Sequence, residues 1–269
     1  MATNQMRREA AKRKLAHQQQ RRMDAARKRK RTAVIVSAAV VVVVVVAVVL
    51  LTLPSGADDP APTAQAAAAP GTVSCEYPAE ANAAKANQPP QTTGVSNVGT
   101  AEVALGTSAG PISLTLDRAK APCTVNSFLS LAGQGYFDNT QCHRLTTGEG
   151  LKVLQCGDPT AQGTGGPGYT IADEPPTGLA PSPSGGGTVI YPRGTVAMAK
   201  TAAPNSGGSQ FFLVYADSTL PPDYTVFGTI DQAGLATIDK VAAGGTDNSN
   251  GEGDGKPVTP VTIQSAKVA

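Results

Sequence analysis

The sequence has no tryptophan and only two histidines, His17 and His143. Its four cysteines contain no C-x-x-C pair, and because zinc sites are commonly built from such pairs, the cysteines argue against a zinc centre. There is no G-x-x-x-x-G-K loop to cradle a phosphate and no Ser-His-Asp arrangement in recognisable surroundings. We therefore expect no metal, nucleotide or redox cofactor.

Charge is distributed unevenly along the 269 residues. Residues 1–32 hold twelve of the 22 Lys and Arg residues but only two of the 20 acidic ones. The next run, Ala33–Leu53, has 21 uncharged residues, mostly Val and Ala, with no Gly or Pro. This length suits a bilayer core about 30 Å thick. We therefore predict a basic cytoplasmic segment, 1–32, followed by a transmembrane helix, 33–53.

The flanks of the apolar run predict its orientation. Because cytoplasmic flanks collect Lys and Arg, we expect the N-terminus in the cytoplasm and everything after Leu53 outside. A signal peptide has a shorter apolar region, followed directly by a cleavage site. We therefore favour a retained single-pass anchor in the cell membrane. The alternative is that the chain is cleaved near Ala64–Ala66 and the anchor is removed. Nucleic-acid binding would also use clustered cations, but orientation of the anchor accounts for them, and we expect no nucleic-acid partner.

The amino-acid composition changes again after the predicted anchor. Residues 54–98 are rich in Ala, Pro, Gln, Thr and Asn and have almost no large apolar side chains. Such a stretch cannot bury enough surface to offset the entropy of ordering, so we predict a disordered linker. Residues 99–269 are numerous enough for one hydrophobic core, and we predict a single domain there.

The pattern of the predicted domain is mainly β. Two segments have helical patterns, one after Pro122, with Thr124 as a candidate cap, and one over Gln232–Ala243. Short apolar or alternating runs separated by Gly, Pro, Asn and Asp predict strands at Ala101–Leu105, Pro111–Leu116, Val153–Gln155, Thr188–Ala199, Gln210–Tyr215, Tyr224–Ile230 and Val258–Ile263. Many strands with two helices favour a closed antiparallel barrel capped by the helices.

All four cysteines lie C-terminal to the predicted anchor. In an oxidising compartment an even number of cysteines favours disulfides. Cys142 and Cys156 flank the two strands of a predicted hairpin, so we pair them with each other, which leaves Cys75 with Cys123. The second bridge would attach the later part of the linker to the domain.

Six segments between residues 100 and 267 occur in an order and approximate spacing typical of one family. They are Cys142-His143-Arg144-Leu145, Gln155-Cys156-Gly157-Asp158-Pro159, Gly163-Thr164-Gly165-Gly166, Gly194-Thr195-Val196-Ala197-Met198-Ala199, Pro204-Asn205-Ser206-Gly207-Gly208-Ser209-Gln210-Phe211-Phe212 and Tyr224-Thr225-Val226-Phe227-Gly228. Together they resemble the cyclophilin signature. The resemblance implies a closed eight-stranded antiparallel barrel with two helices, an Xaa-Pro binding groove and peptidyl-prolyl cis/trans isomerase activity, with proline-containing polypeptides as partners.

This reaction breaks no bond. Rotation about a prolyl bond faces a barrier of about 18–20 kcal/mol because the amide is conjugated, and uncatalysed exchange takes tens to hundreds of seconds. A catalyst must bind the twisted amide more tightly than the planar one, and a fixed donor aimed at the amide nitrogen does so. The resemblance implies that Arg144, whose guanidinium stays protonated, is this donor.

Eight further residues match substrate-binding positions of the family. The resemblance assigns them as follows: Val153, Phe212 and Leu220 to the proline ring, Gln155 and Gln210 to the substrate backbone, Gly163 and Ala199 to the groove walls, and Tyr224, where the family has His or Tyr, to closing the pocket. Three acids nearby, Asp158 and Asp173–Glu174, are interpreted as solvated residues of turns.

The chain departs from the family beside this pocket. Lys152 stands where a large aromatic residue is common, in a segment where Thr147–Gly150 looks inserted. Thr219 falls near a position that is usually Trp or another aromatic and helps to bind cyclosporin, and Lys200 replaces a familiar Asn. We therefore expect modest isomerase activity and weak or no cyclosporin binding.

The predicted function is isomerisation of Xaa-Pro bonds in exported or cell-envelope proteins, whose folding is limited by slow prolyl steps. Two alternatives stay open. Lys152 favours a proline-peptide binding module or chaperone with little catalysis. The predicted linker favours a surface interaction module that is displayed outside the membrane.

Overall fold

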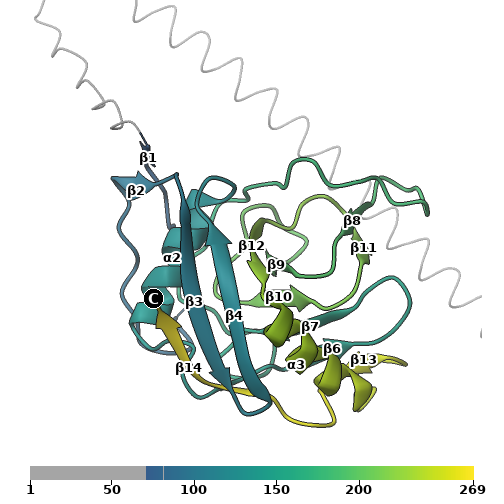
Figure 1. Cartoon of the computed structure of the whole chain (residues 1–269). Helices are drawn as coiled ribbons and strands as arrows, with labels where there is room; N and C mark the ends of the chain where they lie inside the picture. The colour runs from purple at the N-terminus through teal and green to yellow at the C-terminus, as the bar shows by residue number, and fades with distance from the viewer. Residues whose placement is uncertain (1–70, 81) are drawn as a thin grey trace, which may run out of the picture. The chain divides into compact units, whose positions relative to one another are not determined.

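The computed structural model describes residues 71–80 and 82–269 (Figure 1). The predicted basic segment, the predicted anchor at 33–53 and the first part of the predicted linker lie outside the described residues. Over the ranges 71–80 and 82–269, no helix is both long enough and apolar enough to cross a membrane.

The longest strands form a hairpin that crosses the front of the view in Figure 1. These strands, β3 (Thr100–Thr107) and β4 (Gly110–Asp117), pair antiparallel along their whole length. Alternate side chains of β3 are buried, as the alternating sequence requires when one face of a sheet covers a core. The hairpin thereby provides one wall of that core.

Ten antiparallel strands form the main sheet, in the order β13-β6-β7-β10-β9-β12-β4-β3-β14-β5. The strands not yet placed are β5 (Thr140–Gln141), β6 (Arg144–Thr146), β7 (Val153–Cys156), β9 (Thr195–Met198), β10 (Phe211–Val214), β12 (Val226–Ile230), β13 (Asp254–Gly255) and β14 (Thr262–Val268). Two smaller sheets pair β1 (Thr72–Val73) with β2 (Val95–Ser96), and β8 (Val189–Tyr191) with β11 (Ser218–Leu220).

The predicted mainly antiparallel β fold with two helices is confirmed, but the predicted closure with eight strands is not seen. The main sheet is curled and has ten strands, and its end strands β13 and β5 each pair on one side only. Both end strands have two residues, too few to show an alternating pattern, so their sequences do not predict them as strands.

The described residues contain two helices, α2 (Pro122–Gly133) and α3 (Gln232–Ala243). Helix α2 begins at Pro122, whose missing N–H costs nothing in the first turn, so Thr124 lies inside the helix and the predicted cap is wrong. The carboxylate of Glu174 caps α2 instead, because it accepts hydrogen bonds from the N–H groups of Cys123 and Thr124. Asp231 caps α3 through the N–H of Gly234.

Two clusters of buried side chains lie on opposite sides of the main sheet's central strands. The larger contains Phe128, Phe211 and Phe227 with most of the aliphatic residues. The smaller contains Phe212 and Tyr191 among others. Phe211 and Phe212 belong to different clusters because neighbouring strand residues point to opposite faces.

Residues 71–98, apart from 81, form a segment that we call the N-terminal strap. The strap runs alongside α2 (Figure 1). It is held by the Cys75–Cys123 disulfide, by a hydrogen bond from Tyr77 Oη to the Cys123 carbonyl and by the buried side chain of Val95. Within the described residues, this later part of the predicted linker is therefore fixed to the domain.

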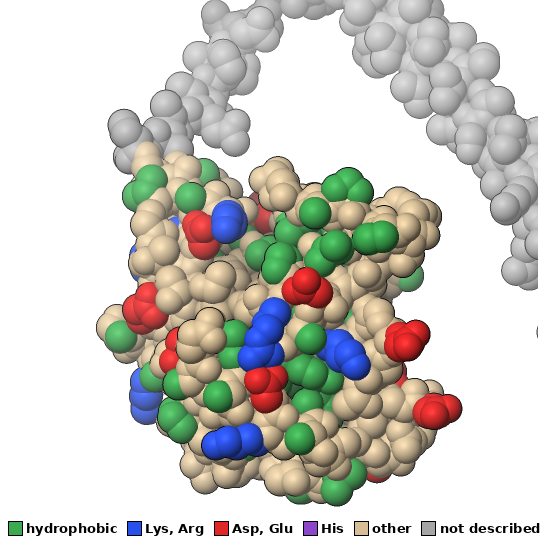
Figure 2. Space-filling view, turned by 45° about the vertical axis from the view of Figure 1, so that its right-hand side comes forward, with side chains coloured by type: hydrophobic (Ala, Val, Ile, Leu, Met, Phe, Trp, Pro, Cys, Tyr) green, Lys and Arg blue, Asp and Glu red, His purple; other side chains and the backbone are tan. Residues whose placement is uncertain are grey.

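Both predicted disulfides, Cys75–Cys123 and Cys142–Cys156, are confirmed. They close loops of different length, with sequence separations of 48 and 14 residues. On the face shown in Figure 2, basic and acidic side chains lie near one another without a broad patch of either sign.

Candidate active site

A cavity of about 150 Å³, which we call the smaller cavity, gathers most of the predicted site. Seven of the nine residues that the resemblance assigned to catalysis or substrate binding line it, namely Arg144, Val153, Gln155, Ala199, Phe212, Leu220 and Tyr224. Leu151 and Lys200 complete the lining and were not among those nine. The other two predicted residues, Gly163 and Gln210, line a neighbouring cavity of about 430 Å³, the larger cavity.

The apolar side chains of the smaller cavity are positioned by neighbouring strands. Phe212 of β10 lies opposite Gln155 of β7, and Val153 lies two residues before Gln155 on the same strand. The ring of Tyr224 packs edge-on against Phe212, with the ring centroids 5.6 Å apart. Leu151 contributes an aliphatic surface to the smaller cavity. The sequence did not predict this, because the insertion at Thr147–Gly150 makes the alignment of this segment ambiguous and the family position was assigned to Lys152.

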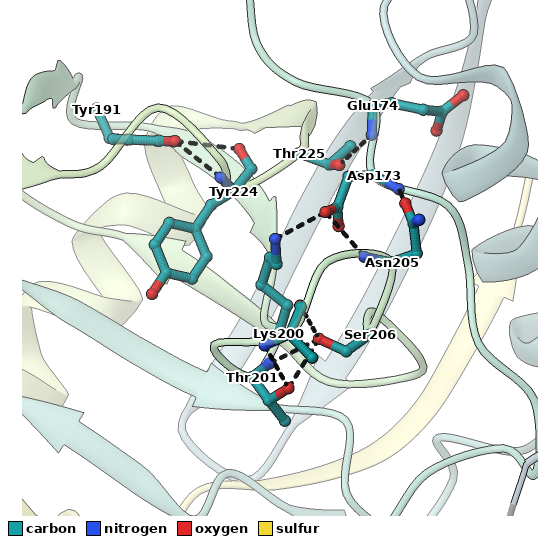
Figure 3. A network of polar contacts seen from close by, with 10 residues as sticks. Asp173, Glu174, Tyr191, Lys200, Thr201, Asn205, Ser206, Tyr224 and Thr225 are labelled. Atoms are coloured by element: carbon teal, nitrogen blue, oxygen red, sulfur yellow. Dashed lines mark hydrogen bonds and ion pairs between the residues drawn. The ribbon is translucent and has the colours of Figure 1, made fainter. Parts of the chain in front are cut away.

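Tyr191 fixes the backbone at Tyr224 (Figure 3). Its buried hydroxyl donates to the carbonyl oxygens of Pro221 and Tyr224 and accepts from the Tyr224 N–H. Burial raises the pKa of Tyr191 to about 12, so the hydroxyl keeps the proton that it donates. Tyr224 is thereby held against the smaller cavity.

The guanidinium of Arg144 is clamped by a carboxylate from the far end of the chain. Its Nε donates to Asp254 Oδ1 at 2.8 Å and its Nη2 to Asp254 Oδ2 at 2.6 Å. This bidentate pairing raises the pKa of Arg144 and lowers that of Asp254. The remaining nitrogen, Nη1, lies 3.4 Å from Gln155 Oε1, a long and weak contact. Arg144 is thus oriented by Asp254 while Nη1 stays available.

Sequence reasoning missed Asp254. It is separated from Arg144 by 110 residues and belongs to a Gly-rich and Asn-rich turn that carried no family motif. Strand β13, which contains Asp254, pairs with β6, which contains Arg144. A two-residue strand gives no detectable pattern, and this pairing brings the two side chains together.

The two predicted amide side chains connect the cavities. Gln155 Nε2 donates to Gln210 Oε1 at 2.9 Å, and Gln210 Nε2 donates to the Gly165 carbonyl at 3.0 Å. Lys200 lies between the cavities and lines both. Its ammonium group is 2.7 Å from Asp173 Oδ2, and the two side chains are only 8% and 18% exposed (Figure 3).

The interpretation of the three nearby acids as solvated is wrong. Asp158 is fully buried, and its carboxylate accepts hydrogen bonds from the backbone N–H groups of Thr160, Thr164 and Gly165. Burial raises the pKa of Asp158, but these donors outweigh it and the net shift is downward. The carboxylate therefore shapes the loop that carries Gly163. Asp173 pairs with Lys200, and Glu174 caps α2.

His143 adjoins Arg144, and its two ring nitrogens have no hydrogen-bond partner in the described part of the chain. Burial lowers its pKa below 6.5. Between this lowered pKa and a pH of about 6.5, the unfolded chain therefore binds a proton that the folded chain does not. We expect the free energy of unfolding, measured with urea, to fall from pH 7 to pH 5 more steeply in the wild type than in His143→Gln. Equal slopes would contradict this assignment.

A cavity that combines apolar side chains with a fixed guanidinium, on a curled antiparallel sheet with two helices, defines a class of protein. Residues 102–268 match the family described as cyclophilin type peptidyl-prolyl cis-trans isomerase/CLD. The chain therefore belongs to the cyclophilin-type peptidyl-prolyl cis-trans isomerases.

Several known proteins are similar to this chain. A probable peptidyl-prolyl cis-trans isomerase B of Mycobacterium leprae is 54% identical over 200 residues, covering 73% of this chain and 67% of that protein. Its Mycobacterium tuberculosis counterpart is 53% identical over 195 residues, covering 71% and 62%. A crystal structure of a Cryptosporidium parvum cyclophilin has a TM-score of 0.50 and 28% identity, covering 64% of this chain and 98% of that one. The chain thus spans about two thirds of the mycobacterial proteins.

Proposed function

We propose that the prolyl ring of a substrate binds in the smaller cavity while Arg144 stabilises the twisted amide. The observation that carries this proposal is that the guanidinium lines the same cavity as the apolar side chains of Val153, Phe212 and Leu220. As the amide loses conjugation, its nitrogen accepts a hydrogen bond more readily. Nη1 donates to that nitrogen, since Nε and Nη2 are engaged by Asp254. A donor that is already oriented strengthens its bond in the transition state without reorganisation.

The substrates that we propose are exported or cell-envelope proteins that fold outside the membrane. The basic segment 1–32 and the apolar run 33–53 support a single-pass anchor with the domain on the outer side. The two disulfides favour an oxidising compartment. Refolding of such proteins is often limited by prolyl isomerisation, which this enzyme accelerates.

Two measurements test this function. The full chain is expected to accelerate the cis-to-trans exchange of a short Xaa-Pro peptide, and to speed the slow refolding phase of a protein limited by a prolyl bond. For the topology, protease added to intact spheroplasts should degrade the domain while a cytoplasmic marker survives. A domain that stays protected until the cells are lysed would overturn the outward orientation.

The position of Lys152 does not support the alternative of a proline-peptide binding module or chaperone with little catalysis. That alternative rested on Lys152 occupying the pocket, whereas Leu151 lines the smaller cavity and the Lys152 ammonium donates to the Thr147 carbonyl at 2.7 Å. The apolar lining that a proline ring requires is therefore intact, and we propose catalysis.

We expect cyclosporin to bind weakly, with a dissociation constant in the micromolar range or above. Thr219 offers a hydroxyl, 3.3 Å from Ser182 Oγ, where an aromatic ring would provide a large apolar contact. Inhibition of the full chain by cyclosporin checks this, and Thr219→Trp should strengthen it. Nanomolar inhibition of the wild type would contradict the prediction.

A further inference from the structure

The N-terminal strap forms part of the wall of the larger cavity. Glu80 and Asn82 line this cavity together with the glycine-rich loop that carries Gly163. Backbone hydrogen bonds attach the strap to that loop: the Glu80 N–H donates to the Gly168 carbonyl at 3.0 Å, and the Ala84 N–H donates to the Gly166 carbonyl at 2.9 Å. The cavity is therefore completed by a segment that precedes the rest of the domain in sequence.

This wall lies outside the part of the chain that matches the family, which begins at residue 102. The strap is nevertheless held at several points along its length. The Cys75–Cys123 disulfide fixes one part, and the ammonium group of Lys85 donates to the carbonyl oxygens of Gly135 and Asp138 at 2.7 and 2.9 Å. Glu80 lies between these two attachment points in the sequence, and its own backbone N–H is bonded to the loop, so the backbone that carries its exposed carboxylate is held beside the larger cavity.

The larger cavity has an uncompensated negative charge. Its lining contains one carboxylate, Glu80, and one ammonium group, Lys200. The charge of Lys200 is balanced by Asp173, 2.7 Å away and largely buried. Glu80 is exposed and forms no ion pair with any residue in the described ranges. The other lining residues are neutral at pH 7, and several of them have hydroxyl or amide side chains.

The two cavities are adjacent, because Gln155, Ala199 and Lys200 line both of them. A peptide whose proline ring occupies the smaller cavity therefore brings a flanking side chain to the larger one. A cationic side chain complements a cavity with one free carboxylate and many hydrogen-bond acceptors, whereas an acidic side chain is repelled.

We propose that Glu80 of the strap is a specificity-determining residue that favours a Lys or Arg side chain near the isomerised proline. The proposal rests on the proposed function, since it assumes that the proline ring binds in the smaller cavity. Asn82 and the acceptor groups of the loop orient the cation, while Glu80 supplies the charge.

The experiment compares peptides in which Lys, Ala or Glu is placed at each of the three residues on either side of the proline. For the full chain, one position is expected to show a kcat/KM about three times higher with Lys than with Ala, as for an exposed ion pair, and lower still with Glu. Added salt should weaken this preference because it screens exposed charges. Glu80→Gln should remove the preference, and Glu80→Lys should reverse it towards Glu.

Glu76→Lys is the matched control. It makes the same charge change on the same strap at an exposed residue that does not line the larger cavity, and it should leave the preference unchanged. Suppose that the wild type, Glu80→Gln and Glu80→Lys all isomerise the peptides but show the same charge preference, or no preference. The inference about Glu80 is then wrong, while the isomerase function stands. If the wild type converts no peptide, the proposed function itself fails.

Discussion

Replacing Arg144 with Ala is expected to lower kcat/KM for Xaa-Pro isomerisation by about a hundredfold, which corresponds to roughly 2.7 kcal/mol of barrier. The substitution removes the donor for the amide nitrogen but leaves the apolar lining from Val153, Phe212 and Leu220. Peptide binding should therefore change little, and the loss should fall mainly on kcat. A coupled peptide assay for activity and calorimetry for binding separate the two quantities.

Arg144→Lys distinguishes a fixed donor from a mere positive charge. A lysine ammonium is a point charge on a flexible stem and cannot make the bidentate contact with Asp254 while also donating into the cavity. Arg144→Lys should consequently lose most of the activity. If Arg144→Lys is as active as the wild type, charge alone is sufficient and the oriented hydrogen bond is not required.

Asp254→Asn tests how the guanidinium is held. An amide accepts only one of the two hydrogen bonds that the carboxylate accepts at 2.8 and 2.6 Å, so Arg144 becomes less well oriented. The expected loss in kcat is about tenfold, smaller than for Arg144→Ala, since a misplaced catalytic group still works in part. An unchanged kcat would show that Asp254 only stabilises the fold.

The sequence was most informative where a motif and a regular pattern coincide. Gln155 and Phe212 lie on strands with clear apolar patterns, and strand pairing brings them opposite each other. The disulfide between Cys142 and Cys156 followed from the same hairpin. In these places a local pattern determines the register, and the register determines which side chains meet.

Sequence reasoning failed where contacts depend on long-range pairing of irregular segments. Asp254 and Glu174 form hydrogen bonds with residues far away in the sequence, and neither belongs to a segment with a regular apolar pattern. Residues of the strap were predicted as linker because they carry few large apolar side chains. Such a segment is held by a disulfide and by hydrogen bonds to backbone carbonyls, which composition does not report.

Removing the Cys75–Cys123 disulfide is expected to cause the largest loss of stability. With a sequence separation of 48 residues, the chain-entropy relation gives about 4 kcal/mol for the double replacement by Ala, against about 3 kcal/mol for Cys142 and Cys156, separated by 14 residues. A disulfide that closes the longer loop removes more conformational entropy from the unfolded chain. Urea unfolding of a fragment that begins near Pro70, extrapolated to water, measures both differences.

The two disulfides should also differ in their effect on function. Cys75 and Cys123 hold the strap, whereas Cys142 precedes the strand that carries Arg144 and Cys156 is the last residue of the strand that carries Gln155. Loss of the strap disulfide should therefore spare isomerisation of a neutral peptide in the folded protein and weaken the preference for a flanking cation. If isomerisation of neutral peptides is lost as well while the domain stays folded, the strap supports the smaller cavity too, and its role is not confined to the neighbouring wall.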